Sequence, residues 1–81
     1  MATEQKLQAL AGGESTQAVV TTWFVEEGDQ VKAGDLLVEI EAEKTASEVE
    51  SEHTGVLTRI VAAVGDEIEI GDVLAEFELD S

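Results

Sequence analysis

Residues 25–41 read VEEGDQVKAGDLLVEIE, and residues 62–78 read AAVGDEIEIGDVLAEFE. When the chain is shifted by 37 residues, both Gly-Asp pairs of the first stretch fall on the two Gly-Asp pairs of the second. Extending the alignment to 18–41 against 55–78 gives nine identities in 24 positions. Similarity that keeps its register over this length indicates two related halves, each a single supersecondary unit.

Apolar and polar residues alternate in both halves with the period of a β-strand. The pattern predicts an inward face formed by Leu36, Val38 and Ile40 in the first half and by Val73, Ala75, Phe77 and Leu79 in the second. It places Leu37 and Leu74 on the outward face, together with Glu39, Glu41, Glu76 and Glu78. Two further sets are each predicted to share one face: Val19, Thr21, Trp23 and Val25, and Val56, Thr58 and Ile60. Trp23 is therefore interpreted as a core aromatic residue.

The Gly-Asp pairs separate these runs, as expected where a turn needs a positive φ or a carboxylate that bonds to the backbone. Each half is predicted to form a strand, a turn, a short strand, a turn and a strand. Several short strands at close spacing indicate an all-β sandwich or flattened barrel, and the repeat predicts a pseudo-twofold axis. The polar first residues and 79–81 are expected to be tails.

Length and charge exclude several classes of function. With 81 residues the chain is one small domain, and its net charge of −15 argues against nucleic acid or anionic membranes as partners. Cysteine is absent and His53 is the sole histidine, so thiolate chemistry, a histidine-based zinc site and a catalytic triad are excluded or disfavoured. No apolar run could span a membrane and no leader is visible, so we expect a soluble, intracellular domain.

The acidic composition itself has three interpretations. It can simply keep the surface soluble, it can match a basic partner surface, or it can reflect a host with high internal salt. Asp29, Asp35, Asp66 and Asp72 could suggest calcium, but each follows a turn glycine and is interpreted as a turn residue. No metal site is predicted.

Glu43 and Lys44 are predicted to be the central residues of a tight hairpin turn, because they lie between the runs 36–42 and 46–49. Shifting Lys44 by 37 residues in either direction reaches Leu7 or Ser81, where the chain enters and leaves. The turn should therefore lie opposite both termini. Lys44 could be a solubilising tip residue. Because an exposed lysine without a desolvating pocket is a poor nucleophile or base, the functional alternative is covalent amide modification by another enzyme.

Five stretches follow one another in a specific order: 23–31 (WFVEEGDQV), 34–41 (GDLLVEIE), 43–45 (EKT), 48–51 (EVES) and 55–57 (GVL). This series resembles the lipoyl domain of 2-oxo acid dehydrogenase complexes, and 7–10 (LQAL) is similar to that family's opening strand. The resemblance covers about 5–79. It implies a flattened barrel of two four-stranded sheets and a single lipoyl domain over 1–81, excised from a longer multidomain chain.

The resemblance implies that lipoic acid is amide-linked to Lys44, between Glu43 and Thr45, by a lipoate ligase or lipoyl-transfer enzyme. The arm would carry acyl groups and reducing equivalents between a thiamine diphosphate-dependent decarboxylase, an acyltransferase core and dihydrolipoyl dehydrogenase, in a 2-oxo acid or acetoin dehydrogenase complex. The domain would catalyse nothing itself but would belong to a dihydrolipoyllysine-residue acyltransferase. The implied location is the cytoplasm of a prokaryote or the mitochondrial matrix of a eukaryote.

The chain departs from the family pattern at several positions, and two alternatives to a lipoyl domain stay open. The tip reads Glu-Lys-Thr rather than the usual Asp-Lys-Ala, and no proline stands at Gln8, Glu50 or Glu52. Related biotin carriers have methionines on both sides of the lysine, and this chain has none there. A biotinyl domain nevertheless remains an alternative, as does an unmodified barrel-sandwich interaction module. The resemblance also assigns partner recognition to the loop after the first strand, which corresponds to Gly12, Gly13, Glu14, Ser15 and Thr16.

Overall fold

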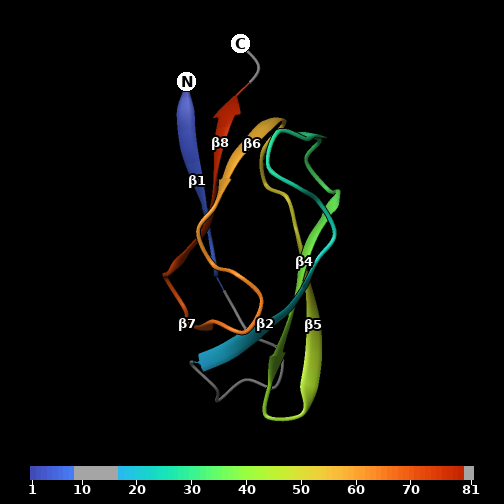
Figure 1. Ribbon diagram of the computed structural model, residues 1–81, viewed down its shortest axis with the longest axis vertical. Helices are drawn as coiled ribbons and strands as arrows, with labels where there is room; N and C mark the ends of the chain where they lie inside the picture. The colour runs from blue at the N-terminus through green and yellow to red at the C-terminus, as the bar shows by residue number, and fades with distance from the viewer. Residues whose placement is uncertain (9–16, 80–81) are drawn as a thin grey trace.

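The computed structural model describes residues 1–8 and 17–79. These residues form eight β-strands and contain no helix (Figure 1). In chain order the strands are β1 (Ala2–Lys6), β2 (Gln17–Trp23), β3 (Gln30–Val31), β4 (Leu36–Ala42), β5 (Thr45–Glu50), β6 (Gly55–Ile60), β7 (Glu67–Glu69) and β8 (Val73–Leu79). The predicted succession of strand, turn, short strand, turn and strand is therefore present in both halves.

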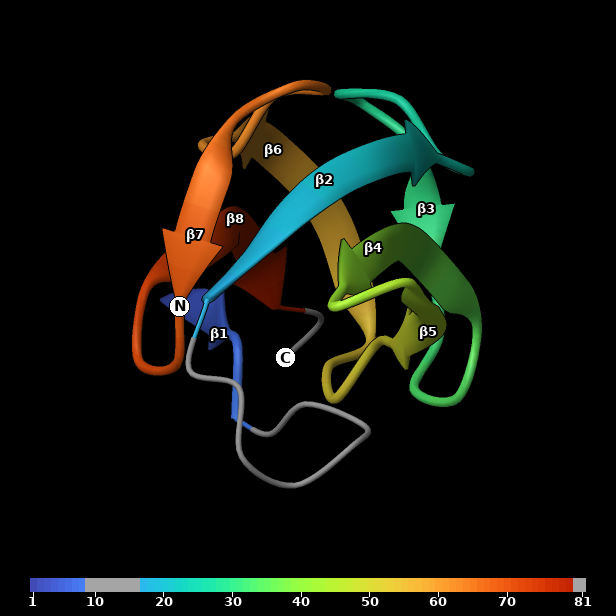
Figure 2. The ribbon, with the colours of Figure 1, turned by 90° about the horizontal axis from the view of Figure 1, so that it is seen from below.

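The strands form two antiparallel four-stranded sheets with the orders β1-β8-β6-β3 and β5-β4-β2-β7. A shift of 37 residues carries β2, β3 and β4 onto β6, β7 and β8, and each half lends its short strand to the other half's sheet. Seen down the long axis, the sheets face one another across a shared interior (Figure 2). The predicted all-β fold is confirmed as a flattened structure of two sheets rather than a closed barrel.

The pseudo-twofold relation extends to β1 and β5, but with a different shift. Leu36 pairs with Glu50, whereas its counterpart Val73 pairs with Lys6, so β1 and β5 are related by 44 residues. Under these relations Met1 and Leu79 occupy the positions of Thr45 and Ala42. The β4–β5 turn therefore has its counterpart at the two ends of the chain.

All four Gly-Asp pairs form the same turn. In each, the aspartate amide donates to the carbonyl three residues earlier, and the aspartate Oδ2 accepts from that earlier residue's amide at 2.8–3.0 Å. The preceding glycine has a φ between 94° and 97°, as the third position of a type II turn requires. The interpretation of Asp29, Asp35, Asp66 and Asp72 as turn residues is confirmed.

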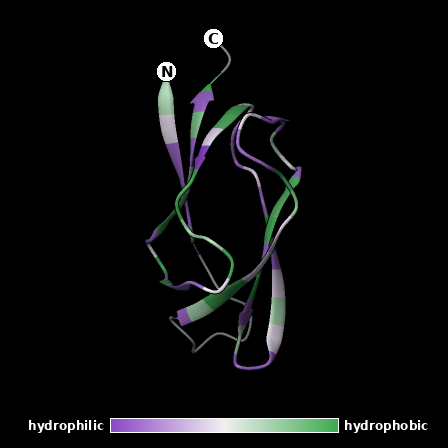
Figure 3. Cartoon of the chain, viewed as in Figure 1, coloured by the Kyte–Doolittle hydropathy of each residue, from purple (hydrophilic) through white to green (hydrophobic). Residues whose placement is uncertain are grey.

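The core fills the space between the sheets with small and medium apolar side chains around one large residue, Phe77. Leu37, Leu57 and Leu74 are fully buried beside it. Strands carry hydrophobic and hydrophilic segments, whereas the β4–β5 turn is hydrophilic (Figure 3). Trp23 is half-buried against this core, and its Nε1 donates to the Ala62 carbonyl at 2.6 Å, which agrees with its predicted role.

Part of the predicted inward face is wrong. Val19 and Leu36 are each 39% exposed, whereas Leu37 and Leu74, predicted to point outward, are fully buried. The cause is a register shift within β4–β5 and another within β1–β8, which leave Leu37 and Leu74 as extra residues beside inward-facing neighbours.

The predicted faces of β2 and β6 are also partly wrong, for the same reason. Register shifts fall at Thr21 in β2 and at Thr58 in β6, and each threonine hydroxyl donates to a carbonyl of the adjacent strand. Before each shift the inward residues are Ala18 and Val20, or Gly55 and Leu57; after it they include Trp23 or Ile60. Val19 therefore does not share a face with Trp23, and Val56 does not share one with Ile60.

The prediction of an N-terminal tail is also wrong. Residues 2–6 form β1, which pairs with β8 along its whole length. Gln5, 2% exposed, donates to Glu52 Oε1 at 3.2 Å and accepts from the Glu52 amide at 2.9 Å, which joins β1 to the loop after β5. Polar residues here form a strand because β8 offers a full edge of backbone partners. Leu79, also assigned to a tail, belongs to β8.

The molecule is elongated, with principal extents of 37 × 19 × 17 Å. Met1 and Leu79 meet at one end, where the Leu79 amide donates to the Met1 carbonyl at 2.8 Å. The β4–β5 turn lies at the other end (Figure 1). The predicted placement of the Lys44 turn opposite the termini is confirmed for Met1 and for Leu79, the last residue that the structure describes.

Candidate cofactor-attachment site

Lys44 is the second residue of a two-residue turn between β4 and β5. Ala42 pairs with Thr45 across the strand ends, so Glu43 and Lys44 alone make the reversal. Their φ values are 48° and 69°, the pair of positive angles that defines a type I′ turn. The turn's twist matches that of the flanking strands, so the hairpin carries Lys44 to its tip as an extension of the sheet.

This turn is built without glycine or asparagine, although both central positions are left-handed. A left-handed conformation costs a residue with a Cβ roughly 1–2 kcal/mol. Strain of this kind persists where surrounding structure enforces it, and it is concentrated at functional sites. Glu43, Lys44 and Thr45 are all exposed, so burial does not explain why these residues stand there.

The Lys44 ammonium has no carboxylate within 4.0 Å among the described residues. The described residues form one ion pair, between the Met1 ammonium and Glu78 Oε1 at 3.0 Å. Lys6, Lys32 and Arg59 likewise have no carboxylate partner among the described residues. Within 1–8 and 17–79, therefore, no carboxylate engages the Lys44 amine. Such an amine can be acylated by an enzyme that encloses the turn.

The other residues considered from the sequence either have structural contacts or lie outside the described residues. The ring of His53 packs against Phe77 with centroids 5.7 Å apart, and its Nε2 lies 3.2 Å from the Glu4 carbonyl oxygen. Within 1–8 and 17–79, no three histidine, aspartate or glutamate side chains gather as metal ligands. The loop from Gly12 to Thr16, predicted to recognise partners, lies outside the described part of the chain.

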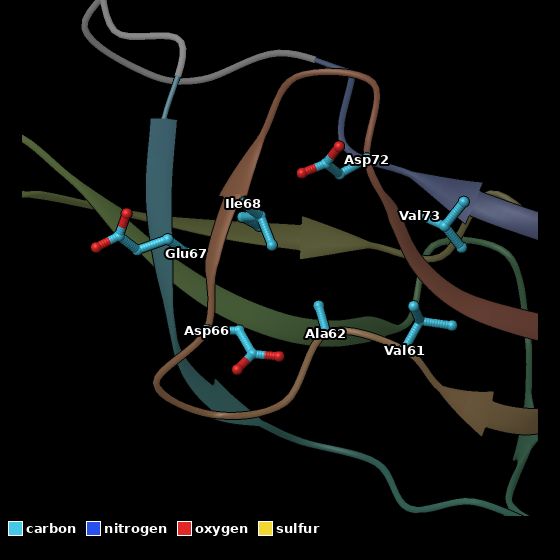
Figure 4. A pocket seen from close by; sticks show the side chains of 7 residues that line it. All are labelled: Val61, Ala62, Asp66, Glu67, Ile68, Asp72 and Val73. Atoms are coloured by element: carbon cyan, nitrogen blue, oxygen red, sulfur yellow. The ribbon is translucent and has the colours of Figure 1, made fainter.

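A hollow of about 390 Å³ lies between the turns that flank β7 (Figure 4). It is lined by Val61, Ala62, Asp66, Glu67, Ile68, Asp72 and Val73. Asp66 and Asp72 already serve as turn residues, and no cationic or nucleophilic side chain lines the hollow. It therefore offers no catalytic arrangement. No helix capable of crossing a membrane occurs among the described residues.

Sequence reasoning missed two residues on which contacts between segments far apart in the chain depend. Gln5 is one, because a polar residue near the N-terminus carries no signal of burial. Gly55 is the other: a Cβ there would meet the Glu78 carbonyl oxygen and lie 2.9 Å from Leu79 Cα. Its counterpart in the first half is Ala18, so the repeat itself hides the requirement for glycine.

A flattened pair of sheets that presents a lone lysine on a tight turn, away from the chain ends, is the design of a carrier domain. A family model described as "Biotin-requiring enzyme", Biotin_lipoyl, matches residues 6–77. The chain belongs to this biotin/lipoyl family.

The chain is similar in sequence to acyltransferase components of 2-oxo acid dehydrogenase complexes. The dihydrolipoyllysine-residue acetyltransferase component of the Zymomonas mobilis pyruvate dehydrogenase complex is 41% identical over 61 residues, which are 75% of this chain and 14% of the relative. The succinyltransferase component of the Rickettsia bellii 2-oxoglutarate dehydrogenase complex is 46% identical over 52 residues, 63% of this chain and 13% of the relative. The chain thus spans about one seventh of the length of these relatives.

Two solved structures share the fold. The lipoyl domain of the Azotobacter vinelandii 2-oxoglutarate dehydrogenase complex superposes with a TM-score of 0.72 at 31% identity, over 94% of this chain and 98% of that domain. A single-chain long-chain acyl-CoA carboxylase superposes with a TM-score of 0.79 at 22% identity, over 98% of this chain and 7% of that protein, a likeness of fold alone. The prediction of a lipoyl-type carrier domain is confirmed.

Proposed function

We propose that Lys44 carries lipoic acid, joined through an amide to its Nζ, and that the domain presents this arm in turn to the enzymes of a 2-oxo acid or acetoin dehydrogenase complex. The observation that carries the proposal is the position of Lys44. It lies at the tip of a strained, glycine-free type I′ turn, at the end of the molecule opposite Met1 and Leu79.

Lipoate is favoured over biotin by two independent features. The 31% identity to a lipoyl domain extends over nearly the whole of both chains, whereas the likeness to the carboxylase concerns the fold alone. The residues beside the lysine are also different: this chain has Glu43 and Thr45 where biotin carriers have methionines. A biotinyl domain is therefore the second candidate, and the two cofactors add different masses to the protein.

Bound lipoate supplies a dithiolane that accepts and releases acyl groups and electrons. The β4–β5 hairpin holds the attachment point at one end of the domain, where no described carboxylate pairs with it. Conversion of the Lys44 ammonium to an amide removes one positive charge from a turn that already contains Glu43. The domain contributes presentation and recognition, and the bond chemistry belongs to the partner enzymes.

The enzymes implied are a lipoate ligase or lipoyl-transfer enzyme, a thiamine diphosphate-dependent decarboxylase, an acyltransferase core and dihydrolipoyl dehydrogenase. The longer relatives support placing the domain within a dihydrolipoyllysine-residue acyltransferase. We also propose that it acts in the cytoplasm of a prokaryote or in the mitochondrial matrix of a eukaryote.

The direct test is to co-express the domain with a lipoate ligase in medium containing lipoate and to map the modified peptide by mass spectrometry. We expect one lipoyl mass, on Lys44, with Lys6 and Lys32 unmodified, because neither of these lies on a hairpin tip. A lipoyl mass on another lysine, or a biotinyl mass on Lys44 in cells that supply both cofactors, would contradict the proposal.

A second test exchanges the two turn residues. The double substitution Glu43→Lys and Lys44→Glu keeps composition and charge, and both positions already have positive φ. The lysine side chain nevertheless starts from the first turn position instead of the second, so its amine points in a different direction from that of Lys44 in the parent. Since misplacing a reacting group by about 1 Å can cost roughly 100-fold in rate, we expect lipoylation to slow by one to two orders of magnitude.

Circular dichroism and the melting temperature of the exchanged variant should match those of the parent, because the turn and its strands are unchanged. Lipoylation at the parent rate would show that exposure alone, rather than position on the turn, selects the lysine.

A further inference from the structure

Beside the Lys44 turn, a groove of about 240 Å³ runs across the outer face of the β5-β4-β2-β7 sheet. Its lining residues are Gln17, Ala18, Val19, Glu41, Ala42, Glu43 and Glu67. Ala42 and Glu43 directly precede Lys44, so the groove is continuous with the proposed attachment site. An enzyme that encloses Lys44 must cover this end of the sheet.

Val19 is the exposed apolar residue of this groove, and it lies between two carboxylates. It pairs with Glu41 on β4 at one side and with Glu67 on β7 at the other. Directly paired residues point to the same face of a sheet, and two strand spacings separate Glu41 from Glu67, about 10 Å. The side chain of Glu67 points across β2, away from Asp66 and Asp72 (Figure 4).

The arrangement fits one kind of ligand group. A lysine or arginine side chain can lay its methylene stem on Val19 and place its charged head between the two carboxylates. No cation of the domain fills this role, because among the described residues no lysine or arginine has a carboxylate within 4.0 Å. The groove is therefore complementary in charge and shape to a basic side chain from outside the domain.

Internal symmetry shows that the fold does not require this charge. The counterpart of Val19 is Val56, which pairs with Glu78 and with Gln30. Gln30 thus stands where Glu67 stands, and Glu78 is already paired with the Met1 ammonium. The same strand position accepts a neutral amide in one half and carries a carboxylate in the half that borders Lys44.

We propose that the groove between Glu41 and Glu67 is the docking site for a lysine or arginine side chain of the enzyme that acylates Lys44. This inference rests on the proposed function, because it names a contact made by the attaching enzyme. It assigns to Glu67, which is 23 residues from Lys44 in the sequence and comes from the other half of the repeat, a role in binding that enzyme.

The test uses the unmodified domain, a purified lipoate–protein ligase, lipoate and ATP, with initial rates followed by intact-protein mass spectrometry. Glu67→Gln reproduces the side chain of the symmetry-related Gln30, so it should fold normally. Glu4→Gln, on the exposed face of β1 in the other sheet, is the control with the same loss of charge.

At low ionic strength we expect Glu67→Gln to raise the KM for the domain roughly three- to tenfold with little change in kcat, and Glu67→Lys to raise it further. Glu4→Gln should behave as the parent. The difference between Glu67→Gln and the parent should disappear at about 0.5 M salt, where charges separated by more than several ångströms are screened.

Equal KM values for Glu67→Gln and Glu4→Gln at low salt would overturn the inference while leaving Lys44 as the attachment site. A defect that persists at high salt and accompanies a lower melting temperature would overturn it as well, because it would be a defect of folding. Failure of the parent domain to accept lipoate on Lys44 would instead reject the proposed function, and the inference with it.

Discussion

Replacement of Lys44 by alanine is expected to abolish carriage completely while leaving the domain folded. The Lys44 side chain is exposed and has no carboxylate partner among the described residues, so its removal should change stability by less than about 0.5 kcal/mol. Alanine also tolerates the φ of 69° no worse than lysine does. Lipoate incorporation, measured by mass, and the activity of a complex that has this domain as its sole lipoyl domain should both be lost.

Two controls separate the roles of charge and of the amine. Lys44→Arg keeps the positive charge but cannot form the amide, so it should be as inactive as alanine. Lys32→Ala removes a lysine from a turn remote from the hairpin tip and should be fully lipoylated. Measurable acyl transfer by Lys44→Ala would show that another group holds the arm.

Replacement of Gly55 by alanine is expected to be the most damaging single-methyl change in the described chain. Gly55 opens β6 and pairs with Leu79 on one side and Val31 on the other, so the backbone of β8 closes over it. A Cβ would meet the Glu78 carbonyl oxygen, which cannot move without parting β6 from β8. Overpacking of this kind costs roughly 1–3 kcal/mol, and more where backbone must shift.

The measurement is thermal unfolding. A loss of about 3 kcal/mol lowers the melting temperature of a domain of this size by roughly 12–24 °C. Gly28→Ala is the matched control, because a Cβ there has no atom within 4 Å and only the positive φ of 95° opposes it; it should lose about 1–2 kcal/mol. A Gly55→Ala protein that melts close to the parent would show that the two strands can separate at little cost.

The repeat made much of this fold predictable from sequence. The paired Gly-Asp turns predicted the number and order of strands in each half, because a glycine with positive φ and an aspartate bonded to the backbone occur at both turns within that half. Lys44 was found from the same pattern, since the runs on either side leave only Glu43 and Lys44 to make a turn. The chemistry assigned to Lys44 depended on resemblance rather than on spacing.

What could not be predicted depends on contacts between strands. The register shifts at Leu37 and Leu74 invert the period-2 pattern for one residue, and no local residue type announces them. Gln5 is buried because of hydrogen bonds to Glu52, 47 residues away. The approach of Glu67 to Glu41 across Val19 likewise follows from sheet order, which alternation alone does not specify.

In the proposed role, a domain held at the end that contains Met1 and Leu79 would act as a lever, because the β4–β5 turn lies at the other end. A rotation about the end that holds Met1 and Leu79 sweeps the tip along an arc whose radius approaches the 37 Å long axis. Strands run along most of that length, so the motion passes to the tip with little bending. In the proposed role, the rigid body would add its own length to that of the arm, and the volume searched would grow with the cube of their sum.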